Sequence, residues 1–384
     1  MPWNETNAMN EKVRFISAWL SNEYSVSELC RRFEISRRTG YKFIKRYEAE
    51  GITGLEERSR AHYKHPKAIN GALIDTLLKT KIRYPNWGPR KIKVFLEIEK
   101  PMQVWPAAST IGELFKRHGL VKSKKKRLRT PPHSEPFMDC TAPNNVWSAD
   151  FKGQFKLGTN HYCYPLTITD NYSRYLLGCK CLKSPGKIDV KLYFEKVFKE
   201  YGLPNAIKTD NGTPFASVSI GGLSKLSIWW LKLGITPERI KPGHPEQNGR
   251  HERMHRTLKQ ETATPPQKNI VLQQKITNRF MTEYNEKRPH EALGKMRPIE
   301  VYQSSLRTYP RKLPEIEYED TFVIRKVRHN GEVKFKNKNI YVGTVLSGEI
   351  IGLKEMSEDK WLIYFSTLNI GTMDVRKGKV LRII

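Results

Sequence analysis

The hydrophobic positions of the first 60 residues recur at helical spacing. Residues 11–20 repeat apolar side chains every three or four positions, Ser27 is the expected N-cap of a second short helix, and residues 37–51 indicate a basic helix. A tight turn at residues 34–36 separates the last two helices. This order predicts a helix-turn-helix DNA-binding domain over residues 1–60. Its candidate DNA-binding side chains are Arg37, Arg38, Lys45 and Arg46.

Three further helices are predicted between residues 70 and 121, and Ser109 is the expected N-cap of the third. Their spacing indicates a second helix-turn-helix-like domain, which with a basic linker covers residues 61–130. The linker contains the run KSKKKRLR at residues 122–129. This run is either a solvated hinge or a segment that follows DNA phosphates, and the sequence does not separate the two.

The pattern changes to strands from residue 143. Three β-rich segments come first, followed by a helix, a short strand, a second helix and another short strand. Because consecutive strands followed by alternating helices and strands build a mixed sheet, we expect an α/β domain over residues 140–305. The tail, residues 316–384, is β-rich again and has a hairpin signal at Asn330-Gly331. A small β-barrel is the expected fold of this last domain.

The charge of the chain indicates a polyanionic partner. Its 68 Lys and Arg residues against 39 Asp and Glu residues give a net charge of 68 − 39 = +29. This balance favours nucleic acid over an anionic membrane, and it favours DNA binding over an ordinary three-helix bundle for residues 1–60. No apolar run approaches the roughly 18 residues of a membrane span, and the first residues lack the layout of a signal peptide. Five cysteines without CxxC spacing fit a reduced compartment, so we expect a cytoplasmic, nucleoid-associated protein.

Two glutamates, Glu246 and Glu252, stand in the basic stretch GHPEQNGRHERMHRTLK. Pro245 prevents a helix from continuing through this point, and Asn248 is a good N-cap, so a helix should begin near Gly249. Glu252 then lies in the first helical turns, whereas Glu246 lies in the preceding loop. At about 100° per residue, the face of Glu252 also carries His255, Arg256 and Lys259. The side expected to anchor the helix carries Met254 and Leu258. Geometry therefore favours Glu252 as the functional acid.

Two aspartates can join this glutamate at one edge of the sheet. Asp150 lies in the first predicted strand and faces opposite to Trp147 and Ala149, and Asp210 follows a short strand at a turn. One such acid alone is usually only solvated. Three together could hold two divalent cations roughly 4 Å apart, one at the attacking and one at the leaving oxygen of a phosphodiester. Oxygen ligands indicate Mg²⁺, with Mn²⁺ as a substitute.

The three acids lie in the segments VWSADF (residues 146–151), IKTDNGTPF (207–215) and HPEQNGRHERMHRTLK (244–259). These segments resemble the active-site segments of the retroviral-integrase superfamily of DDE transposases. The stretch YNEKRPHEALGKMRPIEVY, residues 284–302, resembles the segment that closes this domain in bacterial insertion-sequence transposases. Together the matches cover residues 145–302, and the helical and β-rich flanks resemble the usual layout of that group. The resemblance implies a multidomain α and α/β protein with a ribonuclease-H-like core, in which Asp150, Asp210 and Glu252 are the catalytic residues and metal ligands.

The resemblance also supports Glu252 over Glu246, because the acid of the family follows an Asn-Gly-x-x step. The count of residues opposes this choice: 35 residues separate Asp210 from Glu246, a spacing familiar in the superfamily, and 41 separate it from Glu252. The segment after Asp210 can absorb an insertion, so the local motif takes precedence. The positions that match DNA-end contacts of relatives are Arg256, Lys259 and, more weakly, His255.

The function implied by this resemblance is that of a metal-dependent DNA transposase. Water would cleave a phosphodiester at the element's end, and the resulting 3′-hydroxyl would attack target DNA. The helix-turn-helix units would bind the terminal inverted repeats, and a homo-oligomer would assemble on double-stranded DNA. Two rival functions remain open: a catalytically inactive DNA-binding regulator of the same architecture, and a nuclease on the same fold.

Overall fold

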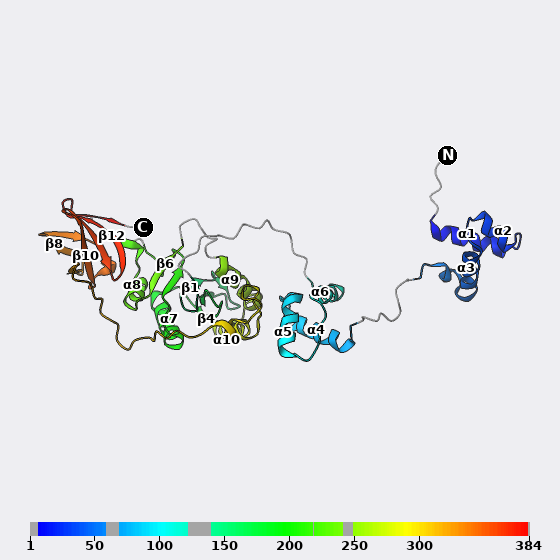
Figure 1. Ribbon diagram of the computed structural model, residues 1–384, viewed down its shortest axis with the longest axis horizontal. Helices are drawn as coiled ribbons and strands as arrows, with labels where there is room; N and C mark the ends of the chain where they lie inside the picture. The colour runs from blue at the N-terminus through cyan, green and yellow to red at the C-terminus, as the bar shows by residue number, and fades with distance from the viewer. Residues whose placement is uncertain (1–6, 59–68, 122–139, 218, 241–248, 383–384) are drawn as a thin grey trace. The chain divides into compact units, whose positions relative to one another are not determined.

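The computed structural model describes residues 7–58, 69–121, 140–217, 219–240 and 249–382 (Figure 1). The chain divides into two compact units, Met1–Asn70 and Gly71–Ile384. The first unit contains the three α-helices drawn in blue and a short 3₁₀ helix, Gly51–Leu55, and the second holds the remaining helices and both large sheets (Figure 1). No helix in these described ranges combines the length and the apolar character needed to cross a membrane.

The first unit has the helix-turn-helix layout predicted from the sequence. Its helices are α1 (Ala8–Leu20), α2 (Val26–Arg32) and α3 (Arg37–Glu50). They enclose a small core whose buried members are Phe15, Ile16, Leu29, Cys30, Ile44 and Leu55. α3 packs closely on α2 at Gly40, where a Cβ atom would lie 2.5 Å from Cys30 Sγ. The absence of a side chain at Gly40 therefore sets the distance between the two helices.

The N-cap of α2 differs from the prediction. The cap is Ser25, whose Oγ accepts a hydrogen bond from the Glu28 backbone N–H at 3.3 Å, so Ser27 lies inside the helix. The expectation for Ser27 was wrong because Ser25 and Glu28 form the S-x-x-E pattern that starts a helix two residues earlier. The cap of α3 is Ser36, whose Oγ accepts from the Thr39 N–H at 3.2 Å.

A second group of helices opens the unit Gly71–Ile384. It consists of α4 (Gly71–Arg83), α5 (Pro89–Glu99) and α6 (Ala108–Arg117). Its core is formed by Leu77, Tyr84, Trp87, Ile92, Leu96, Trp105, Ile111 and Phe115. Ser109 is not the N-cap of α6: the cap position is Ala107, which has no side-chain hydrogen bond to offer. The basic run at residues 122–129 lies outside the described residues.

A mixed sheet follows, as the strand order predicted. Its strands are β1 (Val146–Phe151), β2 (Phe155–Lys156), β3 (Tyr162–Asp170), β4 (Leu176–Leu182), β5 (Ala206–Thr209) and β6 (Thr236–Arg239). β3 pairs antiparallel with β1, β2 and β4, whereas β1, β5 and β6 run parallel to one another. The strands that directly follow one another in the sequence form the antiparallel half of the sheet. The strands that are linked by helices form its parallel half.

Helices cover both faces of this sheet. They are α7 (Lys187–Tyr201), α8 (Lys225–Lys232), α9 (Gly249–Thr262) and α10 (Ile270–Thr282). α7 and α8 bury a large apolar cluster with one face of β1 and β3, including Trp147, Leu166 and Ile168. α9 and α10 form a separate cluster with β4, which includes Met254 and Leu258 of α9. Because strand side chains alternate, the residues between the apolar ones of β1 and β3 face the α9 side.

The C-terminal module is an open sheet with a separate hairpin. Its strands are β7 (Val323–Lys326), β8 (Glu332–Phe335), β9 (Lys338–Tyr341), β10 (Ile350–Ser357), β11 (Lys360–Phe365), β12 (Leu368–Asp374) and β13 (Lys379–Arg382). Five of them pair in the order β13-β12-β11-β10-β7, and β8 pairs only with β9. No pairing between β7 and β13 closes the sheet within the described residues, so the expected barrel is not confirmed.

The hairpin of this module forms at a different turn from the one predicted. β8 and β9 are joined by Lys336-Asn337, and both residues have positive φ (43° and 60°), as a tight two-residue hairpin turn requires. Asn330-Gly331 joins β7 to β8, but β7 pairs with β10 instead. The Asn-Gly signal correctly predicted a turn at this position. It wrongly predicted which strands pair, because strand pairing depends on residues distant in the sequence.

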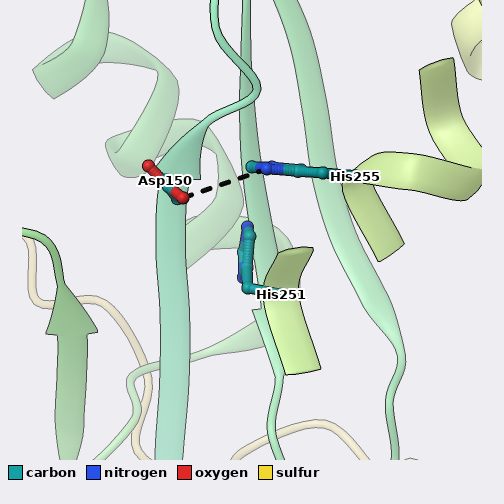
Figure 2. Close-up of side chains that lie close together, drawn as sticks. All are labelled: Asp150, His251 and His255. Atoms are coloured by element: carbon teal, nitrogen blue, oxygen red, sulfur yellow. Dashed lines mark ion pairs between the residues drawn. The ribbon is translucent and has the colours of Figure 1, made fainter. Parts of the chain in front are cut away.

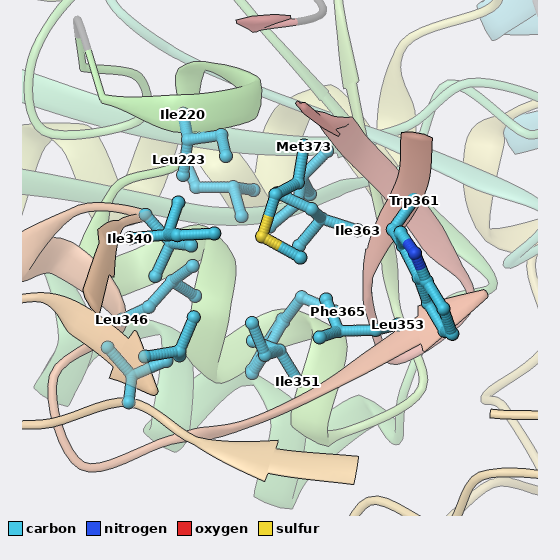
Figure 3. Close-up of a cluster of buried hydrophobic side chains, with 14 of the residues drawn as sticks. Ile220, Leu223, Ile340, Leu346, Ile351, Leu353, Trp361, Ile363, Phe365 and Met373 are labelled. Carbon is cyan, nitrogen blue, oxygen red and sulfur yellow. The ribbon is translucent and has the colours of Figure 1, made fainter. Parts of the chain in front are cut away.

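The C-terminal module and the mixed-sheet domain share one hydrophobic core. Ile220 and Leu223, which precede α8, lie in the same buried cluster as Ile351 and Phe365 of the module (Figure 3). Lys232 of α8 also forms an ion pair with Glu349, with Nζ and Oε2 2.5 Å apart. The module is therefore fixed to the α8 end of the mixed-sheet domain.

The close packing at Gly40 gives a stability prediction. Gly40→Ala places a Cβ against Cys30 Sγ, and we expect overpacking to destabilise the first unit by about 1–3 kcal/mol. Hydrogen exchange of α2 and α3 amides in the full chain should accelerate, while α4–α6 amides should not change. Adding Cys30→Ala, which removes the opposing sulfur, should restore most of the protection. Unchanged exchange in Gly40→Ala would contradict the close contact.

Candidate active site

Asp150 lies on the polar face of β1. The side chains of Trp147 and Ala149 enter the apolar cluster under α7 and α8, so alternation directs Ser148 and Asp150 to the α9 side. The Asp150 side chain is 16% exposed. The sequence prediction that Asp150 faces away from Trp147 agrees with this arrangement.

Asp210 lies at the same edge of the sheet as Asp150. β1 and β5 are parallel neighbours, and Ser148 is paired with Lys208. Asp150 and Asp210 each follow this pair by two residues, so both stand at the carboxyl end of adjacent strands. Asp210 Oδ1 accepts a hydrogen bond from the Gly212 N–H at 3.1 Å, which orients its carboxylate in the turn.

Glu252 lies in the first turn of α9 and is exposed. The structure does not close it onto the two aspartates: in the part of the chain that the structure describes, the one group of three potential ligands whose atoms all lie within 4.8 Å is Asp150, His251 and His255. Glu246 and the expected N-cap Asn248 fall outside the described residues. The choice between the two glutamates therefore stays a prediction.

The first turns of α9 are attached to the sheet by a hydrogen-bond network around Thr167. Thr167 Oγ1 donates to the Asp150 backbone oxygen at 3.0 Å, and it lies 2.6 Å from His251 Nε2 and 2.7 Å from His255 Nε2. Thr169 Oγ1 lies 3.2 Å from His251 Nδ1. His255 Nδ1 lies 3.9 Å from Asp150 Oδ2 (Figure 2). Two strand threonines and two helix histidines thus join α9 to the strand that carries Asp150.

Burial keeps both histidines neutral near pH 7. It lowers the pKa of His251 to about 3, with a further contribution from Lys208, and lowers the pKa of His255 to about 2, with a further contribution from His251. His251 and His255 are 3% and 6% exposed as whole residues. The face expected for His255 was therefore wrong. It packs with Met254 and Leu258, and so little exposed surface does not suit a phosphate contact.

The sequence held two signals for this network. Positions 251, 254, 255 and 258 follow the i, i+3, i+4, i+7 spacing of one buried helix stripe. Thr167 and Thr169 alternate with the buried residues Leu166 and Ile168, which places both threonines on the face of Asp150. At about 100° per residue, His255 lies between Glu252 and Leu258 on the helix, so the arc assigned to the exposed face also included a residue at the edge of the buried stripe. A buried histidine with hydrogen-bond partners packs well there.

Positive charge lies close to the acidic residues. Burial and then Arg250 lower the pKa of Lys208, two residues before Asp210, to about 8. Burial and then Lys259 lower the pKa of Lys152, while Asp150 raises it. Lys152 therefore lies within interaction range of both Lys259 and Asp150. Arg256 and Lys259 are exposed on α9, so this helix presents positively charged side chains to solvent.

The candidate DNA-binding residues of α3 divide between two environments. Arg37, Arg38 and Lys45 are exposed along one side of the helix. Arg46 is half-buried, and its guanidinium carbon lies 5.9 Å from the centre of the Phe43 ring.

Comparison with known proteins agrees with this architecture. Models of the family described as Integrase core domain match residues 141–245 and 233–298. A model described as Helix-turn-helix domain matches residues 11–61, and one described as Homeodomain-like domain matches residues 39–115. The matched regions contain the helix-turn-helix of the first unit and the sheet that carries Asp150 and Asp210.

Two similar proteins come from bacterial insertion elements. An uncharacterised 31.7 kDa protein of insertion element IS407 of Burkholderia multivorans is 26% identical over 253 residues, which are 65% of this chain and 87% of the relative. An uncharacterised 39.2 kDa protein of insertion element IS476 of Xanthomonas euvesicatoria is 23% identical over 289 residues, 75% of this chain and 80% of the relative. Both similarities extend well beyond the integrase core.

Among solved structures, the HTLV-2 integrase catalytic core domain in complex with magnesium is 16% identical, with a TM-score of 0.34. The match covers 42% of this chain and 99% of that one. At this TM-score the match adds nothing to the assignment, which rests on the sequence matches. Together these matches support the prediction, made from the three acidic segments, of a bacterial insertion-sequence transposase of the retroviral-integrase superfamily.

The Thr167 network gives a second prediction. Thr167→Val removes the hydroxyl that contacts both histidines, and leaving buried polar atoms without partners costs about 1–3 kcal/mol each. We expect the first turns of α9 to exchange amide hydrogens about 10-fold faster or more, as a cost of that size implies. Thr167→Ser keeps the hydroxyl and should remain close to wild type. Equal protection of α9 in both variants would mean that the network does not hold the helix.

Proposed function

We propose that this protein is a DNA transposase that cleaves the ends of its element and joins the resulting 3′-hydroxyl groups to target DNA. The register of β1 and β5 carries the proposal, because it sets Asp150 and Asp210 at one edge of the sheet in a chain of the integrase core family. Glu252, from the helix that packs over the Asp150 face, is proposed as the third acid. Two strand acids and one helix acid suffice for a metal-assisted phosphodiester reaction.

Asp150, Asp210 and Glu252 would hold divalent cations. Their donors are carboxylate oxygens, which suit Mg²⁺, with Mn²⁺ as a substitute and two ions per site. The strand register supports the fit, because it sets two carboxylates at the ends of adjacent parallel strands, on the one edge of the sheet where a cation could be held by both. When bound, the ions would activate the attacking oxygen and stabilise the leaving oxygen.

The basic residues of α9 would position the DNA. Arg256 and Lys259 are exposed on the helix that carries Glu252, and Lys152 lies within interaction range of Lys259. Side chains in these positions can grip phosphates on either side of a scissile bond while the carboxylates stay bound to cations. His255 is left out of this set because it is buried.

The helix-turn-helix of the first unit would recognise the terminal inverted repeats. The exposed residues Arg37, Arg38 and Lys45 lie on α3, the second helix of the motif, which enters the major groove in proteins of this architecture. We propose that Arg46 contacts the DNA beside these three residues. Because two element ends must be joined to one target, we propose that a homo-oligomer assembles on the DNA.

The acids give the decisive prediction. Asp150→Asn, Asp210→Asn and Glu252→Gln should each abolish cleavage and strand transfer in Mg²⁺ on labelled DNA carrying the inverted repeats that flank the gene. Each substitution keeps the size of the side chain and removes the negative charge that holds a cation. Glu246→Gln is the matched control and should keep its activity, since Glu246 precedes the helix.

Four outcomes would contradict this assignment. Cleavage that survives Asp150→Asn or Glu252→Gln would remove that acid from the site. Loss of activity in Glu246→Gln with retention in Glu252→Gln would exchange the two glutamates. A wild-type chain that binds the repeats without cutting them would be a regulator, and one that cuts without joining would be a nuclease.

The basic face of α9 gives a separate prediction on binding. The double variant Arg256→Ala/Lys259→Ala removes both charges and should weaken binding to element-end DNA. The slope of log K against log salt concentration should fall in magnitude by about 2, because each lost phosphate contact changes this slope by about 0.9. Lys187→Ala/Lys196→Ala removes equal charge from exposed positions of α7, on the other face of the sheet. An equal loss of slope in both variants would mean that only net charge matters.

A further inference from the structure

The Thr167 hydroxyl fixes the tautomers of both histidines. A hydroxyl has one proton to donate and two lone pairs with which to accept. Thr167 Oγ1 uses its proton on the Asp150 backbone oxygen, 3.0 Å away. The contacts to His251 Nε2 at 2.6 Å and His255 Nε2 at 2.7 Å must then be donated by the rings. A histidine that binds a metal is neutral, and in that state each ring carries its proton on Nε2 and its lone pair on Nδ1.

The two Nδ1 atoms have different surroundings. His251 Nδ1 accepts from the Thr169 hydroxyl at 3.2 Å, so both nitrogens of that ring are engaged within the protein. His255 Nδ1 instead faces the carboxylate of Asp150, with 3.9 Å between Nδ1 and Oδ2 (Figure 2). A lone pair directed at a carboxylate oxygen cannot form a hydrogen bond with it, since neither atom carries a proton. Two converging acceptors of this kind suit a cation between them.

We propose that His255 Nδ1 and Asp150 Oδ2 ligate the same divalent cation, so that the metal site contains a nitrogen donor in addition to the carboxylates. Two metal–ligand bonds of about 2.1 Å can span up to about 4.2 Å, and the 3.9 Å between Nδ1 and Oδ2 falls within that reach. This inference rests on the proposed function in one respect, that Asp150 is a metal ligand.

The network around the ring is what a metal-binding histidine requires. Such a histidine donates its other ring N–H to a fixed acceptor, which sets the ring orientation and the tautomer. Here the acceptor is Thr167 Oγ1, and that hydroxyl is anchored on the backbone of Asp150, the proposed co-ligand. His251, with both nitrogens engaged, is a positioning residue that helps to hold Thr167.

A nitrogen donor changes which metal the site prefers. Mg²⁺ is hard and takes oxygen ligands, whereas imidazole suits transition metals such as Mn²⁺ better than it suits Mg²⁺. With His255 as a ligand, the site should favour Mn²⁺ over Mg²⁺ by more than a carboxylate-only site would. The Mn²⁺ assigned as a substitute from the sequence would then be the better-bound ion.

The test uses Mn²⁺ alone as the probe, with the full chain and no DNA. Pulsed electron paramagnetic resonance of bound Mn²⁺ should show coupling to a ¹⁴N nucleus in the wild type. His255→Gln should lose this coupling and bind Mn²⁺ about 10- to 100-fold more weakly, with a smaller change for Mg²⁺ measured by competition. His161→Gln, at an exposed histidine outside α9, is the control and should keep both the coupling and the affinity.

The outcomes separate the inference from the function beneath it. Wild-type Mn²⁺ binding that is lost in Asp150→Asn but shows no ¹⁴N coupling would overturn the nitrogen ligand and leave the carboxylate site standing. Coupling that persists in His255→Gln would also overturn it. Mn²⁺ binding unaffected by Asp150→Asn would remove the metal site itself. The wild-type spectrum needs no variant, so the inference can fail even if His255→Gln does not fold.

Discussion

The alternation of side chains on β1 and β3 constrains the rest of the site. Trp147 and Leu166 fill the apolar core beneath α7 and α8, and their neighbours Asp150 and Thr167 must therefore face the other side. A helix that covers this second face must satisfy buried hydroxyl and carbonyl groups as well as exclude water. α9 does so with histidine nitrogens beside an aliphatic stripe. The same constraint that builds the core thus brings an acid and two imidazoles together.

Charge compensation is the second condition on this edge of the sheet. Asp150 and Asp210 occupy equivalent places on neighbouring parallel strands, and two carboxylates that approach each other to share a metal ion raise one another's energy. The surrounding lysines reduce this cost only in part, because they are partly desolvated themselves, as the lowered pKa of Lys208 records. The acids at this edge of the sheet are therefore suited to bind metal ions. Once their negative charge is neutralised, the basic chain around them is suited to bind a polyanion such as DNA.

Local patterns predicted the parts of the fold that local physics decides. Helical spacing in residues 11–51 and the order of strands gave the helix-turn-helix and the mixed sheet, and period-two alternation gave the facing of Asp150. The closure of the C-terminal sheet is not confirmed, and the partner of β7 was predicted wrongly, because strand pairing is decided by contacts between distant residues. His255 was assigned to the wrong face because its position lies at the border between the arc of Glu252 and the stripe of Met254 and Leu258. The approach of Glu252 to the aspartates depends on the rotation of α9 and the loop before it, which no local pattern encodes.

The cluster that Ile220 and Leu223 share with the C-terminal strands makes the tail an integral part of the domain beside it. A chain shortened before β7 would leave both side chains facing water and would lose the partner of Lys232, so the shortened protein would tend to aggregate. A tail transplanted from a relative would face the same requirement, since it must present a complementary apolar surface to positions 220 and 223. Recombination between members of this family should therefore succeed more often when its junction lies upstream of Ile220.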